Sequence, residues 1–245
     1  MTPPRSIILC TTPRSGSTLL CTLLRRVEGA GNPESWFRTE DRADFGAGWG
    51  LPPDPDFASY LAAATRAGQG AGGTFALRMM ANNLPELITD LAGLYGPDDD
   101  PVLLARAFGP PAYIRLIRQD RVAQAVSRYR AEASGLWHRH ADGRPLEMSG
   151  DAPRAAPYDR GAIARYRDEI DALNTQWDEW FGQHGLTPLQ VTYEALSADP
   201  AGTVRGLLAA LGLPAQPVPA PGTARLADAQ SADWAARFRD ETGRD

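Results

Sequence analysis

The chain opens with a short apolar segment, a turn and an amphipathic segment, and this order constrains the fold more than any other feature. Ser6–Thr11 is apolar and rich in residues that favour strands, which predicts a buried parallel strand. Ser17–Val27 carries leucines at helical spacing and is followed by Gly29, which predicts a helix that ends there. A strand, a turn and a helix in this order are typical of an α/β protein.

The rest of the chain repeats the alternation of strand and helix. We expect strands at Thr74–Met79, Ala112–Ile117 and Pro188–Tyr193, and helices at Phe57–Ala67, Leu84–Leu94, Asp120–Ala133, Ile163–His184, Pro200–Leu211 and Ser231–Glu241. This pattern predicts an α/β fold with a parallel sheet and helices on both faces. No internal repeat is visible, and we expect one domain over residues 1–245.

Three segments between these elements are predicted to lack regular structure. Gly31–Phe57 is rich in Gly, Pro and aromatic residues and is expected to be irregular. Gly96–Pro101 is expected to be an acidic turn, and Trp137–Arg160 a long polar loop. Loops of that length are usually functional or disordered.

Composition excludes several classes of function. All 25 basic residues are Arg, so mechanisms that need a P-loop lysine, a Schiff base or a lysine base are excluded. The net charge of −5 argues against a nucleic-acid partner. No apolar stretch approaches about 18 residues and no signal peptide is visible, so we expect a cytoplasmic protein with no membrane span. No His, Cys and Asp cluster indicates a metal site, and the two cysteines predict no disulfide framework.

Thr11–Thr18 (TTPRSGST) is the strongest local signal, because it lies between a predicted strand and a predicted helix. The first N–H groups of a helix lack partners and lie at the positive end of its dipole. Gly16 lets the backbone approach an anion closely, the hydroxyl residues add donors and Arg14 adds a cation. The segment therefore predicts a phosphate or sulfate site; an ordinary serine-rich turn is the alternative.

This loop resembles a Walker A loop but departs from it at the lysine. Ser17 stands where that motif has Lys, and the cation comes from Arg14 three residues earlier. The departure disfavours ATP or GTP hydrolysis and kinase activity, in which the lysine contacts the β- and γ-phosphates.

Arg118 and Ser127 form a second group suited to phosphate. Arg118 ends a predicted strand, where open α/β sheets place ligands, and Ser127 lies on the helix that follows. An arginine with a nearby hydroxyl can hold a phosphate firmly. The alternatives are a surface ion pair of Arg118 with Asp120 and a solvated position for Ser127.

Several segments, taken in order, resemble a known enzyme family. They are Pro13–Leu20, Gly31–Phe37, Arg78–Asn82, Arg118–Ser127 followed by Trp137, and Arg225–Arg239. Together they are similar to the Stf0-type bacterial sulfotransferases, which use 3′-phosphoadenosine 5′-phosphosulfate (PAPS). The resemblance spans nearly the whole chain and implies the P-loop-like sulfotransferase fold. It also implies transfer of a sulfuryl group from PAPS to a hydroxyl of a small acceptor, such as a sugar or a glycolipid, and a homodimer is left open.

The resemblance implies roles for residues at both ends of PAPS. Arg14 with Ser15, Gly16, Ser17 and Thr18 would bind the 5′-phosphosulfate and stabilise the leaving phosphate. Arg118, Ser127 and Arg225 would also bind PAPS, the first two at its 3′-phosphate. Arg78, whose family counterpart is basic, would act near the transferring group; a structural salt bridge is its alternative role.

The general base is less directly indicated, because the register through Gly31 and Pro33 places Ser35 at the position of the family's glutamate. Glu34, one residue earlier, is the candidate base, with a solvated loop position as its alternative. His138 and His140 are reserve candidates, because histidine titrates near neutrality.

The acceptor is not identified by the sequence. Asn32 replaces an acidic residue of the family's trehalose enzyme, which argues against trehalose. Aromatic residues could form a wall against a sugar, although core packing is their more common role: Trp36, Phe37, Trp49 and Trp137. We assign Trp177, Trp180 and Trp234 to packing.

Two other classes of function stay open on the sequence alone. One is a P-loop-like nucleotide enzyme such as a small-molecule kinase, and the other is a PAPS-binding module without activity.

Overall fold

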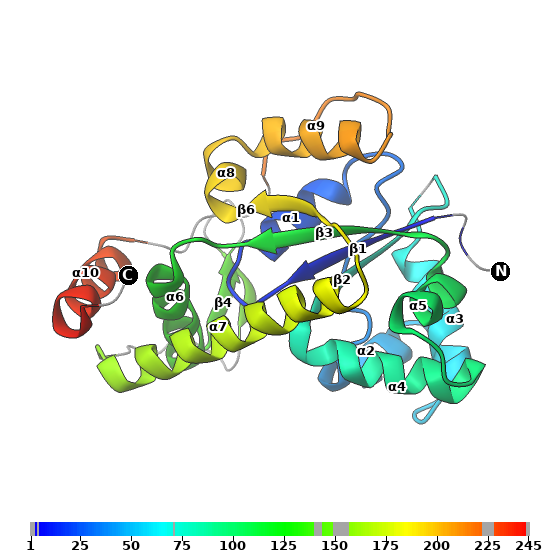
Figure 1. The fold of residues 1–245 in the computed structure, drawn as a ribbon, viewed down its shortest axis with the longest axis horizontal. Helices are drawn as coiled ribbons and strands as arrows, with labels where there is room; N and C mark the ends of the chain where they lie inside the picture. Colours follow the sequence, from blue (N-terminus) through cyan, green and yellow to red (C-terminus); the bar gives the residue numbers. More distant parts are fainter. Residues whose placement is uncertain are drawn as a thin grey trace.

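The computed structural model describes residues 3, 5–70, 72–139, 144–148, 157–221 and 228–243. Its centre is a four-stranded sheet in the order β2-β1-β3-β6, and every neighbouring pair is parallel (Figure 1). The strands are β1 (Ser6–Thr11), β2 (Phe75–Met80), β3 (Pro111–Ile117) and β6 (Leu189–Thr192). Each lies within one residue of a predicted strand at both ends, and the predicted α/β class is confirmed.

The helices around the sheet have the following bounds. They are α1 (Ser17–Leu24), α2 (Thr39–Gly48), α3 (Phe57–Gly68), α4 (Leu84–Tyr95), α5 (Asp100–Phe108), α6 (Arg121–Ser134), α7 (Arg160–Gln183), α8 (Tyr193–Ala198), α9 (Pro200–Ala210) and α10 (Ala229–Thr242), with a short 3-10 turn η1 (Ala81–Asn83) before α4. A separate antiparallel pair consists of β4 (Leu136–Arg139) and β5 (Pro145–Met148).

Both faces of the sheet are buried, which explains why the strands are continuous apolar runs. Side chains alternate between faces along a strand. Ile8 and Cys10 of β1 therefore pack in one core with α3, α4, α5 and the end of α7. Ile7 and Leu9 pack in the other core with α1, α8 and α9.

A third core joins α6, α7 and α10 beyond the carboxyl ends of the strands (Figure 1). Val126 of α6 and Ile163 of α7 are fully buried there, and Trp234 of α10 packs on Tyr129. Trp177 and Trp180 of α7 are also buried, so the assignment of these three tryptophans to packing is confirmed. This layer places α6 beside the edge of the sheet at which a ligand of an α/β protein is expected.

Four expectations about local structure were wrong. Gly31–Phe57 contains the helix α2, which buries only Gly46 and so lacks an apolar stripe in the sequence. The expected turn Gly96–Pro101 contains the start of α5, where Pro101 occupies the first turn and cannot signal a stop. The expected loop Trp137–Arg160 carries most of β4 and all of β5. The first helix ends at Leu24 rather than Val27, because the chain tightens there and the Val27 N–H donates to the Leu24 carbonyl.

Among the helices that the structure describes, none has the length and apolar character needed to cross a membrane.

Candidate active site

The loop between β1 and α1, predicted to bind an anion, leads directly into the N-terminus of a helix. Gly16 is the N-cap of α1 with φ 90°, a conformation that favours glycine, and no side chain caps this helix. A Cβ at Gly16 would lie 2.6 Å from Cδ2 of Tyr193, so the backbone here is closely covered. The leading N–H groups of α1 and the positive end of its dipole lie at this loop.

Arg14 is the only residue other than glycine with positive φ in the described part of the chain, with φ 62°. Such conformations are strained and occur preferentially at functional sites. Its Nε donates to Oγ of Ser127 at 3.0 Å, and its Nη1 donates to the Trp137 carbonyl at 2.7 Å. The Arg14 side chain therefore extends from the loop to α6 and to the start of β4.

The hydroxyls of the loop have different surroundings. Oγ of Ser15 lies 2.5 Å from Oγ1 of Thr11 and 2.8 Å from the Thr12 carbonyl, to which it donates, and Ser15 is fully buried. Its hydroxyl thus stabilises the loop. Ser17 is buried in the first turn of α1, and Oγ1 of Thr18 accepts from Nη1 of Arg78 at 3.1 Å.

Arg118 lies directly after β3 and is 6% exposed. Its Nη1 donates to the Arg14 carbonyl at 3.4 Å, and its guanidinium carbon lies 4.5 Å from the centre of the Tyr193 ring. Asp120, the alternative partner considered from the sequence, caps α6 and accepts from Arg239 at 2.6 Å. The structure therefore brings the two arginines predicted for the two ends of PAPS against the same loop.

Two supports of this loop were missed in the sequence. Gln124 of α6 is fully buried, and its Nε2 donates to Oγ1 of Thr12 at 3.0 Å and to the Pro13 carbonyl at 2.7 Å. Nε1 of Trp177 donates to the Thr11 carbonyl at 2.9 Å. The position of Gln124 between Arg118 and Ser127 was visible, but a polar residue on a helix is usually solvated, so nothing indicated its burial.

The carboxylate of Glu34 connects two arginines at the edge of the sheet. Its Oε1 accepts from Nη2 of Arg78 at 2.6 Å, and its Oε2 accepts from Arg25. Burial opposes its ionisation, but Arg78 and Arg25 outweigh this effect and hold the pKa of the Glu34 carboxyl below its ordinary value. Glu34 is thus an ionised, partly buried group, which makes the alternative of a solvated loop glutamate wrong.

The backbone of the same segment continues the sheet. The Arg78 N–H donates to the Glu34 carbonyl at 3.0 Å. Glu34 also forms an isolated parallel bridge with Leu77 of β2, which is the edge strand of the sheet. Nε of Arg78 donates to Oγ of Ser35 at 2.8 Å. Arg78 therefore links Glu34 and Ser35 to Thr18 at the start of α1, and its salt bridge is compatible with both roles considered for it.

The remaining predicted residues lie elsewhere or outside the described residues. Trp36 and Phe37 are buried in the core with partly buried Trp49 beside them, so these three pack against protein. The Arg128 guanidinium carbon lies over the Trp137 ring, 4.9 Å from the ring centre. Arg225 and His140 fall outside the described residues, and so does the side chain of His138.

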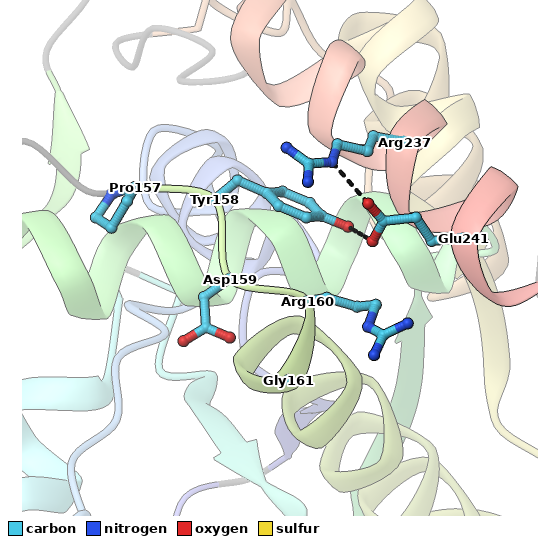
Figure 2. A pocket seen from close by; sticks show the side chains of 7 residues that line it. All are labelled: Pro157, Tyr158, Asp159, Arg160, Gly161, Arg237 and Glu241. Atoms are coloured by element: carbon cyan, nitrogen blue, oxygen red, sulfur yellow. Dashed lines mark hydrogen bonds and ion pairs between the residues drawn. The ribbon is translucent and has the colours of Figure 1, made fainter.

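A pocket of about 660 Å³ lies where the start of α7 meets α10 (Figure 2). Tyr158 donates to Glu241 at 2.8 Å, and Arg237 covers the Tyr158 ring and also donates to Glu241 at 2.8 Å. Of the described residues predicted to bind PAPS, none lines this pocket. The candidate active site is therefore the region around the β1–α1 loop.

Comparison with known proteins identifies the family of the chain. The family model described as Stf0 sulphotransferase matches residues 6–241. A protein named trehalose 2-sulfotransferase from Mycolicibacterium smegmatis is 30% identical, with 99% of this chain and 97% of that protein covered. A protein of the same name from Mycobacterium tuberculosis is 29% identical, with 98% and 96% covered.

Among solved structures, the sulfotransferase domain of the Synechococcus PCC 7002 olefin synthase is similar at 17% identity, with a TM-score of 0.48 and coverage of 97% of this chain and 88% of that one. The extent of the family match and the identity to full-length relatives decide the classification. The chain belongs to the Stf0 family of sulfotransferases.

Proposed function

We propose that this sulfotransferase moves a sulfuryl group from PAPS to a hydroxyl of a small, sugar-like acceptor. The observation that carries the proposal is the meeting of Arg14, Ser127 and Arg118 at the N-terminus of α1, beside the carboxyl ends of the strands. Two guanidinium groups, a hydroxyl and a helix dipole at one edge suit a ligand with two separate phosphates.

At the donor, the loop amides of Ser15, Gly16, Ser17 and Thr18 would hold the 5′-phosphosulfate. Because the Ser15 hydroxyl is turned into the loop, its contribution would come from its backbone N–H. Arg118 and Ser127 would hold the 3′-phosphate, and Arg225 remains a predicted contact outside the described residues.

In the transfer, the acceptor oxygen forms a bond to sulfur while the bond from sulfur to the 5′-phosphate oxygen breaks. Negative charge develops on that phosphate, and donors already in place stabilise it best. Arg14 would supply charge on the side of α6, and Arg78, held by Glu34 and Thr18, on the side of β2.

The acceptor hydroxyl must also lose its proton. Glu34 is the carboxylate at this edge, and its lowered pKa keeps it ionised and able to accept a proton at neutral pH. The two arginines that lower the pKa also weaken it as a base, so a base of moderate efficiency is expected. His138 and His140 stay reserve candidates.

For the acceptor, the two relatives named trehalose 2-sulfotransferase favour a sugar. At two positions this chain differs from the family pattern in a way that argues against trehalose as the acceptor. Ser35, at the position of the family glutamate, accepts from Arg78, and Asn32 donates to the Ala67 carbonyl at 2.8 Å. Both side chains are engaged within the protein, so we expect an acceptor that differs from trehalose.

The proposal is tested first by ligand stabilisation. Adenosine 3′,5′-bisphosphate, the product of the donor, should raise the unfolding temperature, and ATP should raise it less at the same concentration. Equal stabilisation by both would favour a nucleotide enzyme of another class.

The second test follows transfer of labelled sulfate from PAPS to trehalose, other sugars, glycolipids and simple alcohols. Labelled product from a sugar supports the full proposal. Tight binding of the bisphosphate without product from any acceptor would favour a binding module without activity.

A further inference from the structure

The backbone carbonyls of the loop from Thr11 to Arg14 each accept a hydrogen bond from a side chain. In chain order, the donors are Nε1 of Trp177 at 2.9 Å, Oγ of Ser15 at 2.8 Å, Nε2 of Gln124 at 2.7 Å and Nη1 of Arg118 at 3.4 Å. The peptide bonds of this loop are trans, and a trans peptide unit is planar, so its N–H points opposite its C=O. The contacts to the carbonyls therefore also set the directions of the N–H groups that follow them.

Gln124 of α6 holds the peptide unit that joins Pro13 to Arg14. Besides the Pro13 carbonyl, its Nε2 donates to Oγ1 of Thr12 at 3.0 Å, and its Oε1 accepts from Nη1 of Arg121 at 3.3 Å. The side chain is fully buried. Both amide hydrogens and the amide oxygen are thus used within the protein, so Gln124 is suited to hold the loop rather than to bind a ligand itself.

The residue that follows this peptide unit has an unfavourable backbone conformation. The φ of 62° at Arg14 brings its Cβ into steric conflict with the backbone, and such a conformation persists only where the surroundings hold it. Gln124 and Ser127 lie three residues apart on α6 and therefore on one face of that helix. The first holds the carbonyl before Arg14, and the second accepts from the Arg14 side chain at 3.0 Å.

We infer that Gln124 is a positioning residue for the donor, which fixes the Pro13–Arg14 peptide and so holds the anion loop in its binding conformation. The inference rests on the proposed function, since it takes this loop as the site of the 5′ end of PAPS. With the Pro13 carbonyl directed at α6, the Arg14 N–H points away from α6. A carbonyl that turned toward the anion instead would repel it, and successive N–H groups attract it.

The first test compares three nucleotides by calorimetry. AMP carries only the 5′-phosphate, adenosine 3′-monophosphate carries only the 3′-phosphate, and adenosine 3′,5′-bisphosphate carries both. Gln124→Met keeps the length of the side chain and removes its donors. We expect it to weaken AMP and the bisphosphate about 3- to 30-fold, the range of one or two lost hydrogen bonds, and adenosine 3′-monophosphate less than about 2-fold. Equal weakening of all three would overturn the inference.

The second test measures the strain at residue 14 without any nucleotide. Glycine adopts positive φ readily and alanine does not, so Arg14→Gly should unfold at a higher temperature than Arg14→Ala. Both variants lose the same side-chain contacts, so their difference reports on the backbone. In the Gln124→Met background residue 14 can relax, and the difference should disappear or reverse, because glycine then gains nothing and loses more entropy on folding. An equal difference in both backgrounds would show that Gln124 does not hold this conformation.

Gln216→Met is the matched control. Nε2 of Gln216 also donates to two backbone carbonyls, those of Glu28 at 2.9 Å and Pro214 at 3.4 Å, beyond the opposite end of α1. This variant should leave all three dissociation constants unchanged. Should Gln124→Met fail to fold, Gln124→Ala takes its place with the same expected results, because water can then satisfy the Pro13 carbonyl without fixing its direction.

The failures of the two proposals are distinguishable. If Arg14→Ala binds AMP as tightly as the unsubstituted protein, the proposed donor loop is wrong and the inference falls with it. If Arg14→Ala weakens AMP but Gln124→Met does not, the donor loop stands and the positioning role of Gln124 is wrong.

Discussion

The proposed donor side, around Arg14 and Arg118, and the proposed acceptor side, around Glu34, are built from different kinds of contact. On the donor side, Arg14 and Arg118 donate to a hydroxyl and to backbone carbonyls, and Arg118 also stacks on a ring. On the acceptor side, Glu34 joins Arg25 and Arg78 in a chain of charges. The contacts of Arg14 and Arg118 are made by guanidinium groups, which stay charged, whereas the acceptor-side contacts depend on one carboxylate that loses its charge in acid. We therefore expect the donor side to be insensitive to pH, and the acceptor side to fail at acid pH.

Removal of Arg14 should give the largest effect. Arg14→Ala should lower kcat/KM with PAPS by about 10³-fold, because charge on the leaving phosphate loses a preorganised donor. The unfolding temperature should change little. Arg205→Ala, on the exposed face of α9, is the control and should leave kcat/KM unchanged. Activity of Arg14→Ala close to that of the unsubstituted protein would contradict the donor assignment.

The acceptor side is tested by Glu34→Gln, which keeps the size of the side chain and removes its charge. We expect turnover to fall about 10²-fold, the contribution typical of a general base. The Kd of adenosine 3′,5′-bisphosphate should change less than about 3-fold, because Arg78 keeps its hydrogen bonds to Thr18 and Ser35 when the charge of Glu34 is removed. A loss of nucleotide binding as large as the loss of turnover would show that the two sides are not separate.

Gly16→Ala tests whether the close packing of the donor loop matters. The positive φ and the 2.6 Å approach to Tyr193 should together lower the free energy of unfolding by about 1–3 kcal/mol. Urea unfolding measures this change. Gly93→Ala is the control, because Gly93 is exposed in the last turn of α4 and an added Cβ would have no atom within 4 Å. It should raise the free energy of unfolding by up to about 1 kcal/mol. Equal stability of the two variants would be inconsistent with the loop geometry.

The smallest effect should come from Arg25→Gln, seen in the pH profile. The pKa of Glu34 lies below its ordinary value of 4.5, so its ionised form is present above that pKa and is lost as the pH falls through it. Removal of Arg25 removes one of the groups that lower the pKa. The acid limb of kcat should therefore move to higher pH, with turnover at neutral pH nearly unchanged. An acid limb that stays in place would argue against Glu34 as the base.

The strands could be predicted because both faces of the sheet are buried. Continuous apolar runs such as Ser6–Thr11 stand out in the sequence for that reason. The short helix α8 was missed because its six residues bury only Leu196, and α2 was missed for a similar reason. Periodicity is weak for elements that bury no stripe. The helix α5 was missed too, although it buries Leu103, Leu104, Ala107 and Phe108.

Some residues of the candidate site could likewise be predicted from the sequence, and others could not. The anion loop and Arg118 were predictable, because each lies at the end of a recognisable strand. The partners of these residues were not, since Gln124 reaches Thr12 across 112 positions and Tyr193 reaches Gly16 only through the packing of β6 beside β3. Such contacts depend on the order of strands in the sheet, which the local sequence does not specify.

The central claim is that one nucleotide with phosphates at both its 3′ and 5′ positions is held between Arg14 and Arg118. Calorimetric titration of the unsubstituted protein with adenosine 3′,5′-bisphosphate and with AMP tests it most directly. A 3′-phosphate held by charge-assisted hydrogen bonds should make the bisphosphate bind at least about 10-fold more tightly. Equal dissociation constants for the two nucleotides would contradict the account.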